Sequence, residues 1–546
     1  MNTRELFLHE NKWQEFINNY LAVPELQLTI EYSGMNLHES YGKRAKKMID
    51  LAFNEMEELE RGVIVNHDEG RKVGHYWLRS PSLAPSAEIT DAIHTTNERI
   101  RKFADQILKG EILGDSNQQF RAVVLIGIGG SALGPQFVNR ALVRGNHGLS
   151  LYVVDNTDPD EIVQTLRVLP PLDRVLVIVT SKSGGTKETR NAMLVFQEAY
   201  RRIGLNPSSY FVAVTLEDSD LSKQAKQENW LEIFPIWDWV GGRTSEFSAV
   251  GLLPAALCGV NIDRLLAGAS AMDAVTRRKN WVQNPAMILA LCWFNASSGK
   301  GNKAMIVLPY KDRLELFSRY LQQLVMESLG KEFDRDGRLV EQGLTIFGNK
   351  GSTDQHAYVQ QLRDGIDNFF VNFIQVKSES DRDNRQDELS LLGQYEVEKG
   401  VTAGDYLHGF LQGTKEALSE KGRQHLSVCF ERITEESIGS LIALYERAVG
   451  FYASFINVNA YHQPGVEAGK RAANEIIKLQ RQILDYFRDN SDGISLENLC
   501  VRLNIEQKER CFHVISHLVS TGRLQISGDL KDPSSKVFYY QKKKNP

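Results

Sequence analysis

The sequence predicts an α/β protein: two successive αβα sandwiches with parallel sheets, followed by a small winged-helix-like C-terminal appendix. Short apolar runs with β-strand character alternate with helical patterns over 122–215, and the alternation repeats over 304–376. Runs of this kind are typical of parallel strands buried on both faces of a sheet. Beyond 483 the pattern changes to three short helical stretches and then two strand-like runs, which predicts the appendix.

The elements follow in chain order. For the first sandwich we expect strands at 122–128, 149–154, 175–180 and 210–215, with helices such as 159–166 and 186–203 between them. For the second we expect strands at 304–308, 344–347 and 369–376, and helices at 313–329 and 354–363. Long helices are expected at 437–455 and 466–487.

With 546 residues the chain is too long for one compact core, so several domains are expected. Residues 1–95 are predicted to be a helical segment that packs on the second sandwich. The first sandwich is assigned to 96–270, the second to 271–475 and the winged-helix-like appendix to 476–546.

Composition excludes several functional classes. The net charge is −5, so no overall positive field attracts nucleic acid or acidic lipid, and neither is expected as a partner. No apolar run approaches the length of a membrane span. The 5 cysteines form no Cys-x-x-Cys, which is typical of reduced thiols and predicts a cytoplasmic protein.

Two serine- and glycine-rich loops each follow an apolar run and begin a helical pattern. The loop at 181–186 reads Ser-Lys-Ser-Gly-Gly-Thr, so Ser181, Ser183 and Thr186 supply three hydroxyls beside Lys182. Hydroxyls and main-chain N–H groups at a helix start suit a phosphate monoester. A plain N-cap needs only one hydroxyl, so this loop favours ligand binding over simple capping.

The loop at 127–131, Gly-Ile-Gly-Gly-Ser, leaves three interpretations open. Gly130 and Ser131 could line a sugar pocket at the strand ends. The loop also fits a loose G-x-G-x-x-A dinucleotide pattern, with Asp155 as the acid that binds the ribose. A tight strand–helix turn without any ligand is the third interpretation.

Two charged residues further along are candidates for chemistry. Arg243 follows Gly241-Gly242 and could project into a cleft, where its fixed charge would stabilise an oxyanion; a surface ion pair is the alternative. Glu327 shares a helix face with Gln323 in an apolar stretch, which suits a general base. The alternative for Glu327 is a helical pair with Lys331.

His356 and Lys470 complete the candidates. His356 begins a helical pattern after a Gly/Ser loop and could move protons near neutral pH, although a lone histidine is more often structural. Lys470 follows the turn at Gln463-Pro464-Gly465, on one side of a helix with Glu467. That glutamate could aim the lysine into a cleft or form a simple intrahelical pair with it.

Six segments resemble, in type and chain order, the motifs of the glucose-6-phosphate isomerase family in its bacterial form, here with a C-terminal extension. These segments are 127–134, 181–189, 241–243, 323–331, 353–357 and 463–470. The resemblance implies two sugar-isomerase-type αβα domains, a homodimer, and neither metal nor nucleotide cofactor. It also implies reversible isomerisation of glucose 6-phosphate and fructose 6-phosphate through a cis-enediol(ate).

The resemblance implies a role for each candidate. Glu327 is similar to the base that moves a proton between C1 and C2, and Arg243 to the residue that stabilises the enediolate. His356, supplied in this family by the neighbouring subunit, and Lys470 are similar to the ring-opening pair. The phosphate contacts implied are Ser181, Lys182, Ser183 and Thr186, and the sugar contacts implied are Gly130, Ser131, Gln323 and Gln463.

Two rival functions are weaker. A nucleotide-linked oxidoreductase accounts for the first loop but for neither the 181–186 loop nor Glu327. A sugar-phosphate sensor with a DNA-binding appendage predicts loss of the catalytic carboxylate and a basic reading helix, whereas Lys508 and Arg510 are offset by Glu506 and Glu509. Gly185 and Lys187 stand where many family members carry Thr, so one phosphate hydroxyl is expected to be missing.

Overall fold

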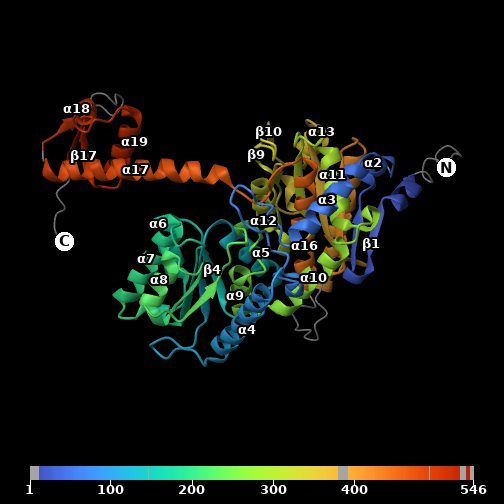
Figure 1. The fold of residues 1–546 in the computed structure, drawn as a ribbon, viewed down its shortest axis with the longest axis horizontal. Helices are drawn as coiled ribbons and strands as arrows, with labels where there is room; N and C mark the ends of the chain where they lie inside the picture. Colours follow the sequence, from blue (N-terminus) through green and yellow to red (C-terminus); the bar gives the residue numbers. More distant parts are fainter. Residues whose placement is uncertain are drawn as a thin grey trace. The chain divides into compact units, whose positions relative to one another are not determined.

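A computed structural model describes residues 12–37, 39–145, 147–378, 392–490, 492–528 and 536–540. The chain forms two compact units, Met1–His462 and Gln463–Pro546. The predicted α/β class is confirmed. Figure 1 shows the strands and helices of both units coloured along the chain.

The first sheet of unit 1 has five strands in the order β4-β3-β5-β6-β7, all parallel. Its strands are β3 (Ala122–Ile126), β4 (Ser150–Val154), β5 (Val175–Thr180), β6 (Phe211–Thr215) and β7 (Glu232–Pro235). Its helices are α4 (Ala87–Lys109), α5 (Leu133–Leu142), α6 (Pro159–Val168), α7 (Lys187–Arg202), α8 (Asp220–Gln227) and α9 (Ala249–Leu257). Every side chain of β3, β5 and β6 is buried, as expected for central parallel strands. The carboxyl ends of β3 and β5 carry the two predicted loops.

The second sheet has six strands in the order β1-β2-β15-β12-β8-β11. Its strands are β1 (Tyr20–Val23), β2 (Leu28–Glu31), β8 (Ala304–Pro309), β11 (Ile346–Phe347), β12 (Phe369–Val376) and β15 (His425–Phe430). The four strands from β15 to β11 are parallel, but β2 pairs antiparallel with β15. The N-terminal segment, predicted as helical, therefore also adds a hairpin to this sheet. Its alternating burial is typical of an antiparallel edge.

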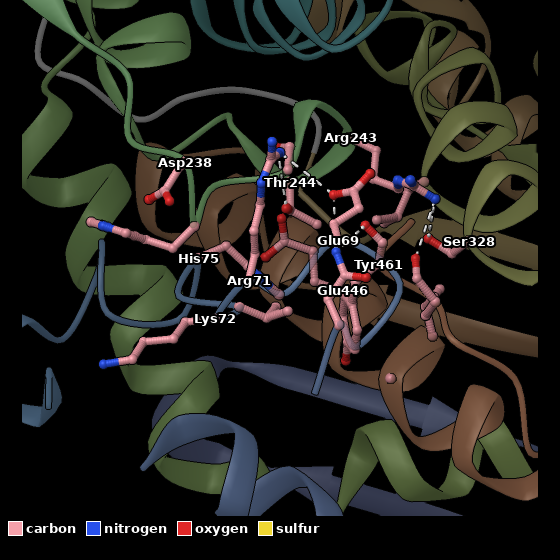
Figure 2. A pocket seen from close by; sticks show the side chains of 18 of the residues that line it. Glu69, Arg71, Lys72, His75, Asp238, Arg243, Thr244, Ser328, Glu446 and Tyr461 are labelled. Carbon is pink, nitrogen blue, oxygen red and sulfur yellow. Dashed lines mark hydrogen bonds and ion pairs between the residues drawn. The ribbon is translucent and has the colours of Figure 1, made fainter. Parts of the chain in front are cut away.

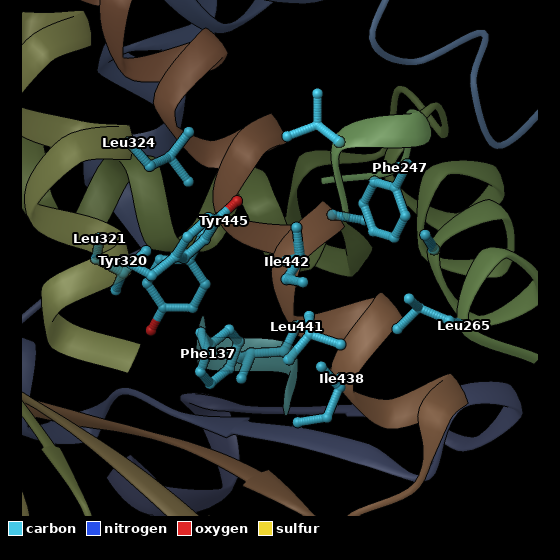
Figure 3. Close-up of a cluster of buried hydrophobic side chains, with 14 of the residues drawn as sticks. Phe137, Phe247, Leu265, Tyr320, Leu321, Leu324, Ile438, Leu441, Ile442 and Tyr445 are labelled. Atoms are coloured by element: carbon cyan, nitrogen blue, oxygen red, sulfur yellow. The ribbon is translucent and has the colours of Figure 1, made fainter. Parts of the chain in front are cut away.

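Helices of unit 1 bury the core between the sheets. α16 (Glu435–Phe455) packs on α10 (Ile262–Thr276) and α11 (Pro285–Ala296). Figure 3 shows Leu324 in a cluster with Phe137 of α5 and with Leu441 and Tyr445 of α16. Unit 1 also contains α2 (Glu39–Arg44), α3 (Lys46–Glu60), α12 (Phe317–Leu321), α13 (Val359–Asp364), α15 (Ala403–Ser419), β9 (Lys331–Phe333), β10 (Leu339–Gln342), β13 (Glu396–Glu398), β14 (Val401–Thr402) and a helical stretch at 12–18.

Unit 2 has its own small core. It contains α17 (Pro464–Asp489), α18 (Leu496–Arg502) and α19 (Lys508–Ser520), with a three-stranded antiparallel sheet in the order β16-β18-β17. The strands are β16 (Ile494–Ser495), β17 (Leu524–Ser527) and β18 (Val537–Tyr540). The predicted boundary between 475 and 476 falls inside α17, because one continuous helix runs through it. The winged-helix assignment stays a prediction.

Candidate active site

Three short segments from distant parts of unit 1 meet at one place. They are η4 (Gly129–Ser131) after β3, η7 (Gly242–Thr244), and the π-helical turn η10 (Gln322–Glu327). A Cβ built on Gly130 would overlap the carbonyl oxygen of Gly242, so only glycine permits this approach of the two main chains. A Cβ on Gly129 would lie 3.1 Å from Nε2 of Gln323. The structure thus brings the predicted sugar-contact residues Gly130 and Gln323 to the Arg243 loop.

Arg243 and Glu327 face each other across this junction. The distance from Arg243 Nε to Glu327 Oε2 is 3.6 Å, and the two side chains are 5% and 20% exposed. The guanidinium also donates to the carbonyl oxygens of Ala460 and His462, each at 3.2 Å. Burial lowers the pKa of Arg243, whereas the charge of Glu327 opposes that shift. A guanidinium held this rigidly can stabilise negative charge that forms on a substrate beside the carboxylate.

Glu327 ends a turn that differs from the predicted helix. The stretch expected as one helix over 313–329 is divided into a 3₁₀ turn, α12 and the π-turn η10. Leu324 and Val325 on this turn are buried, which fixes it against the core. The alternative for Glu327 is an ion pair between its carboxylate and Lys331. The ammonium of Lys331 instead donates to the Glu327 main-chain carbonyl at 2.7 Å. Single π-turns occur frequently at functional sites.

The second predicted loop joins β5 to α7. The amide of Gly184 donates to Ser181 Oγ at 3.1 Å, and the amide of Gly185 donates to Ser183 Oγ at 3.2 Å. Thr186 is the N-cap residue of α7, yet its side chain makes no capping hydrogen bond. A cavity of about 150 Å³ opens at this first turn. Its lining includes Ser181, Gly184, Gly185, Lys187, Arg190 and the acidic Asp220.

Lys182 links this loop to the Arg243 loop. Its ammonium donates to the main-chain carbonyls of Asp238 at 2.8 Å and Val240 at 2.9 Å, immediately before Gly241. Burial, followed by the charge of Arg71, lowers the pKa of Lys182 to about 8. This ammonium is the predicted phosphate contact. It also holds the main chain that precedes Gly241, and the sequence did not indicate that contact.

Three further predicted residues belong to other elements of the chain. His356 is exposed at the end of the 3₁₀ turn η11 (Thr353–His356), which Gln355 fastens by donating to the Phe410 carbonyl at 2.9 Å. Gln463 is the N-cap residue of α17 and Lys470 lies within that helix, so both belong to unit 2. The roles predicted for these three residues stay predictions.

A cavity beside Arg243 is lined by residues that no sequence motif indicated. It has a volume of about 50 Å³, and Figure 2 shows Arg243, Ser328 and Tyr461 at one end of it and His75 further along. The N-terminal stretch 66–75 forms much of its wall through Asn66, Glu69, Arg71, Lys72, Val73 and His75. That stretch carries no glycine-rich or hydroxyl-rich loop, so no local signal indicated it.

Asp155 is the acid of the dinucleotide interpretation of the first loop. Its Oδ2 accepts a hydrogen bond of 3.0 Å from Gln136 Nε2 and lies 3.6 Å from the Arg319 guanidinium. In the part of the chain that the structure describes, no three His, Cys, Asp or Glu side chains are grouped to hold a metal ion. None of the described helices is long and apolar enough to cross a membrane.

Comparison with known proteins decides the family. The family model described as phosphoglucose isomerase matches residues 32–491. The chain belongs to the phosphoglucose isomerase family. The resemblance inferred from the six motifs is thereby confirmed.

Relatives and one solved structure agree with membership of the phosphoglucose isomerase family. A glucose-6-phosphate isomerase of a Synechococcus species is 51% identical over 520 residues, covering 95% of this chain and 96% of the relative. A chloroplastic glucose-6-phosphate isomerase of Arabidopsis thaliana is 49% identical, covering 96% and 86%. The crystal structure of a glucose-6-phosphate isomerase from Chlamydia trachomatis matches with 25% identity and a TM-score of 0.75, covering 87% and 94%.

Proposed function

We propose that this chain is an aldose–ketose isomerase that interconverts glucose 6-phosphate and fructose 6-phosphate in glycolysis and gluconeogenesis. The observation that carries the proposal is the Glu327 carboxylate, which lies 3.6 Å from Arg243 where the two glycine-rich main chains meet. The names of the family relatives support the same substrates.

The proton transfer is assigned to Glu327. In the open-chain sugar, the carboxylate removes the proton from C2, next to the C1 aldehyde, and negative charge collects on the oxygens of the enediolate, where Arg243 balances it. The hydroxyl proton of O2 moves to O1, and the carboxylate returns its proton to C1 as the carbonyl forms at C2. A buried guanidinium is effective because charges interact more strongly away from water and the protein need not reorganise.

The phosphate of the substrate is assigned to the 181–186 loop. Thr186 stands at the N-terminus of α7 with Ser181 and Ser183 close by in the same loop. The partial positive charge of the helix and its free amides favour an anion there. Lys187 and Arg190 on the cavity wall support the same assignment. Gly130, Ser131, Gln323 and Gln463 are the proposed sugar contacts.

Ring opening is assigned to His356 and Lys470 as the acid–base pair. The exposure of His356 supports a role in a neighbouring subunit, so we propose a homodimer with shared active sites. Isomerisation moves hydrogen within a single molecule and needs no external oxidant, so the proposed reaction uses no cofactor. The five cysteines are free and buried, which supports a cytoplasmic location.

A coupled assay for the formation of glucose 6-phosphate from fructose 6-phosphate tests the activity, and Glu327→Gln tests the base. The amide keeps the shape but cannot take a proton, so kcat should fall by about 10²–10⁴-fold. Binding of the sugar phosphate, measured by calorimetry, should persist. The exposed Glu332, changed to Gln, is the matched control and should keep its activity. Wild-type turnover by Glu327→Gln would exclude Glu327 as the base.

A further inference from the structure

Lys331 lies four residues after the proposed base, Glu327, and the proposed function assigns it no role. The residue is 5% exposed, and its ammonium donates to the Glu327 main-chain carbonyl at 2.7 Å. Lysine is almost never fully buried unless its charge is balanced. A buried cation at the end of the turn that carries the base therefore requires an explanation.

Titratable groups from four segments lie near this ammonium. They are Arg243 on η7, Glu327 on η10, Asp68 in the 66–75 stretch, and His462. Burial, and then Arg243, lower the pKa of Lys331 to about 7, while Glu327 and Asp68 oppose the shift. Two cations therefore influence Glu327. Arg243 lies 3.6 Å from its carboxylate, and Lys331 binds its main-chain carbonyl.

The local backbone explains why the lysine folds back. Gly330 follows the π-turn, and its amide donates to the Met326 carbonyl at 2.8 Å. The carbonyls at the end of a helical turn lack partners within the turn. The Lys331 ammonium supplies a donor to the Glu327 carbonyl, and β9 then leads the chain away. A shift of that carbonyl would carry the Glu327 side chain with it, and a displacement of about 1 Å can cost about 10²-fold in rate.

We propose that Lys331 is a positioning residue for the isomerisation: its ammonium holds the end of the turn at Glu327 and, together with Arg243, keeps the carboxylate directed at the substrate carbons. This inference rests on the proposed function, because it gives Lys331 the task of aiming the base. Lys331 itself contacts no reacting atom.

Lys331→Met is the first test, because methionine keeps an unbranched apolar side chain but removes the donor and the charge. We expect kcat to fall by about 10–100-fold and KM to change by less than about threefold. The deuterium isotope effect on kcat, measured with substrate labelled at C2, should rise as proton transfer becomes slower than the other steps. Lys300→Met, at an exposed lysine, is the control and should match the wild type. A lower kcat with an unchanged isotope effect would reduce Lys331 to a purely structural role and overturn the proposal.

Lys331→Arg provides a second readout that also decides the case if Lys331→Met fails to fold. The ammonium fraction of Lys331 in the free enzyme falls as the pH rises through about 7, whereas a guanidinium stays charged. The ratio of kcat/KM for Lys331→Arg to that of the wild type should therefore increase from about pH 6 to about pH 9. A ratio that stays constant would show that the charge of Lys331 has no part in positioning the base.

Glu327→Gln separates failure of this inference from failure of the proposed function. If Glu327→Gln keeps its turnover, the proposed base is wrong, whatever Lys331 does. If Glu327→Gln is inactive while Lys331→Met keeps the wild-type kcat and isotope effect, the proposed function stands and only the positioning role falls.

Discussion

The 181–186 loop and the Arg243–Glu327 junction differ in how far along the chain their stabilising contacts reach. The loop is held by bonds among its own residues, such as those from the amides of Gly184 and Gly185 to neighbouring serine hydroxyls. The junction also has local bonds, such as those from the Thr244 and Ser245 hydroxyls to the Gly241 and Gly242 carbonyls, but its charged side chains reach much further along the chain. Its guanidinium is fixed by carbonyls more than 200 residues further along the chain, at Ala460 and His462. An anion site can be made from a few consecutive residues. The positions of Arg243 and Glu327 relative to each other depend on the folded core.

This difference predicts different kinetic consequences. A change in the loop should weaken the grip on the phosphate equally in the ground state and the transition state, which raises KM. A change at the junction should remove an interaction that forms only as charge develops, which lowers kcat. Substitutions in each region test that division.

Arg243→Lys should give the largest effect. The ammonium keeps the charge but loses the planar fork that reaches the Ala460 and His462 carbonyls, so the charge moves away from the enediolate oxygens. We expect kcat to fall by about 10²–10³-fold, with KM changing by less than about fivefold. Steady-state kinetics in both directions measure this. Arg319→Lys, at a more exposed arginine beside Asp155, is the control. A change confined to KM would place Arg243 in the phosphate grip instead.

Thr186→Val should have a smaller effect of the opposite kind. Valine keeps the shape but removes the hydroxyl at the start of α7, and a hydrogen bond to a charged group contributes about 1.5–3 kcal/mol. KM for glucose 6-phosphate should rise by about 10–100-fold while kcat changes little. The inhibition constant of inorganic phosphate should rise in proportion. Thr157→Val, at an exposed threonine, should leave both unchanged. An unaltered phosphate inhibition constant would remove Thr186 from the phosphate site.

The same contrast explains how much could be predicted from the sequence. The two sandwiches and the 181–186 loop depend on short-range patterns, and both were predicted. Glu327 and Arg243 were identified as candidates by their motifs, but nothing in the sequence showed that they face each other. The pairing of β2 with β15, the burial of Lys331 near Arg243 and Asp68, and the 66–75 wall depend on partners far along the chain. No local periodicity contains that information, so these features could not be predicted.

Lys182 lies where the two regions meet, and each single kinetic constant should change least there. The sequence predicts that Lys182→Ala mainly raises KM. The structure adds two hydrogen bonds from its ammonium to the Asp238 and Val240 carbonyls, which precede the Arg243 loop. We therefore expect KM to rise and kcat to fall together, each by about 3–10-fold. Lys223→Ala, at an exposed lysine on α8, controls for loss of a surface charge.

The balance between the two constants decides what Lys182 does. A rise in KM alone would mean that its ammonium contacts the phosphate and that its carbonyl contacts do not matter for the chemistry. A fall in kcat alone would make it part of the Arg243 junction, although it lies in the phosphate loop. The Lys182 ammonium binds main-chain carbonyls of the segment before Gly241. A change in both constants would therefore show that the 181–186 loop and the Arg243–Glu327 junction are coupled through this contact.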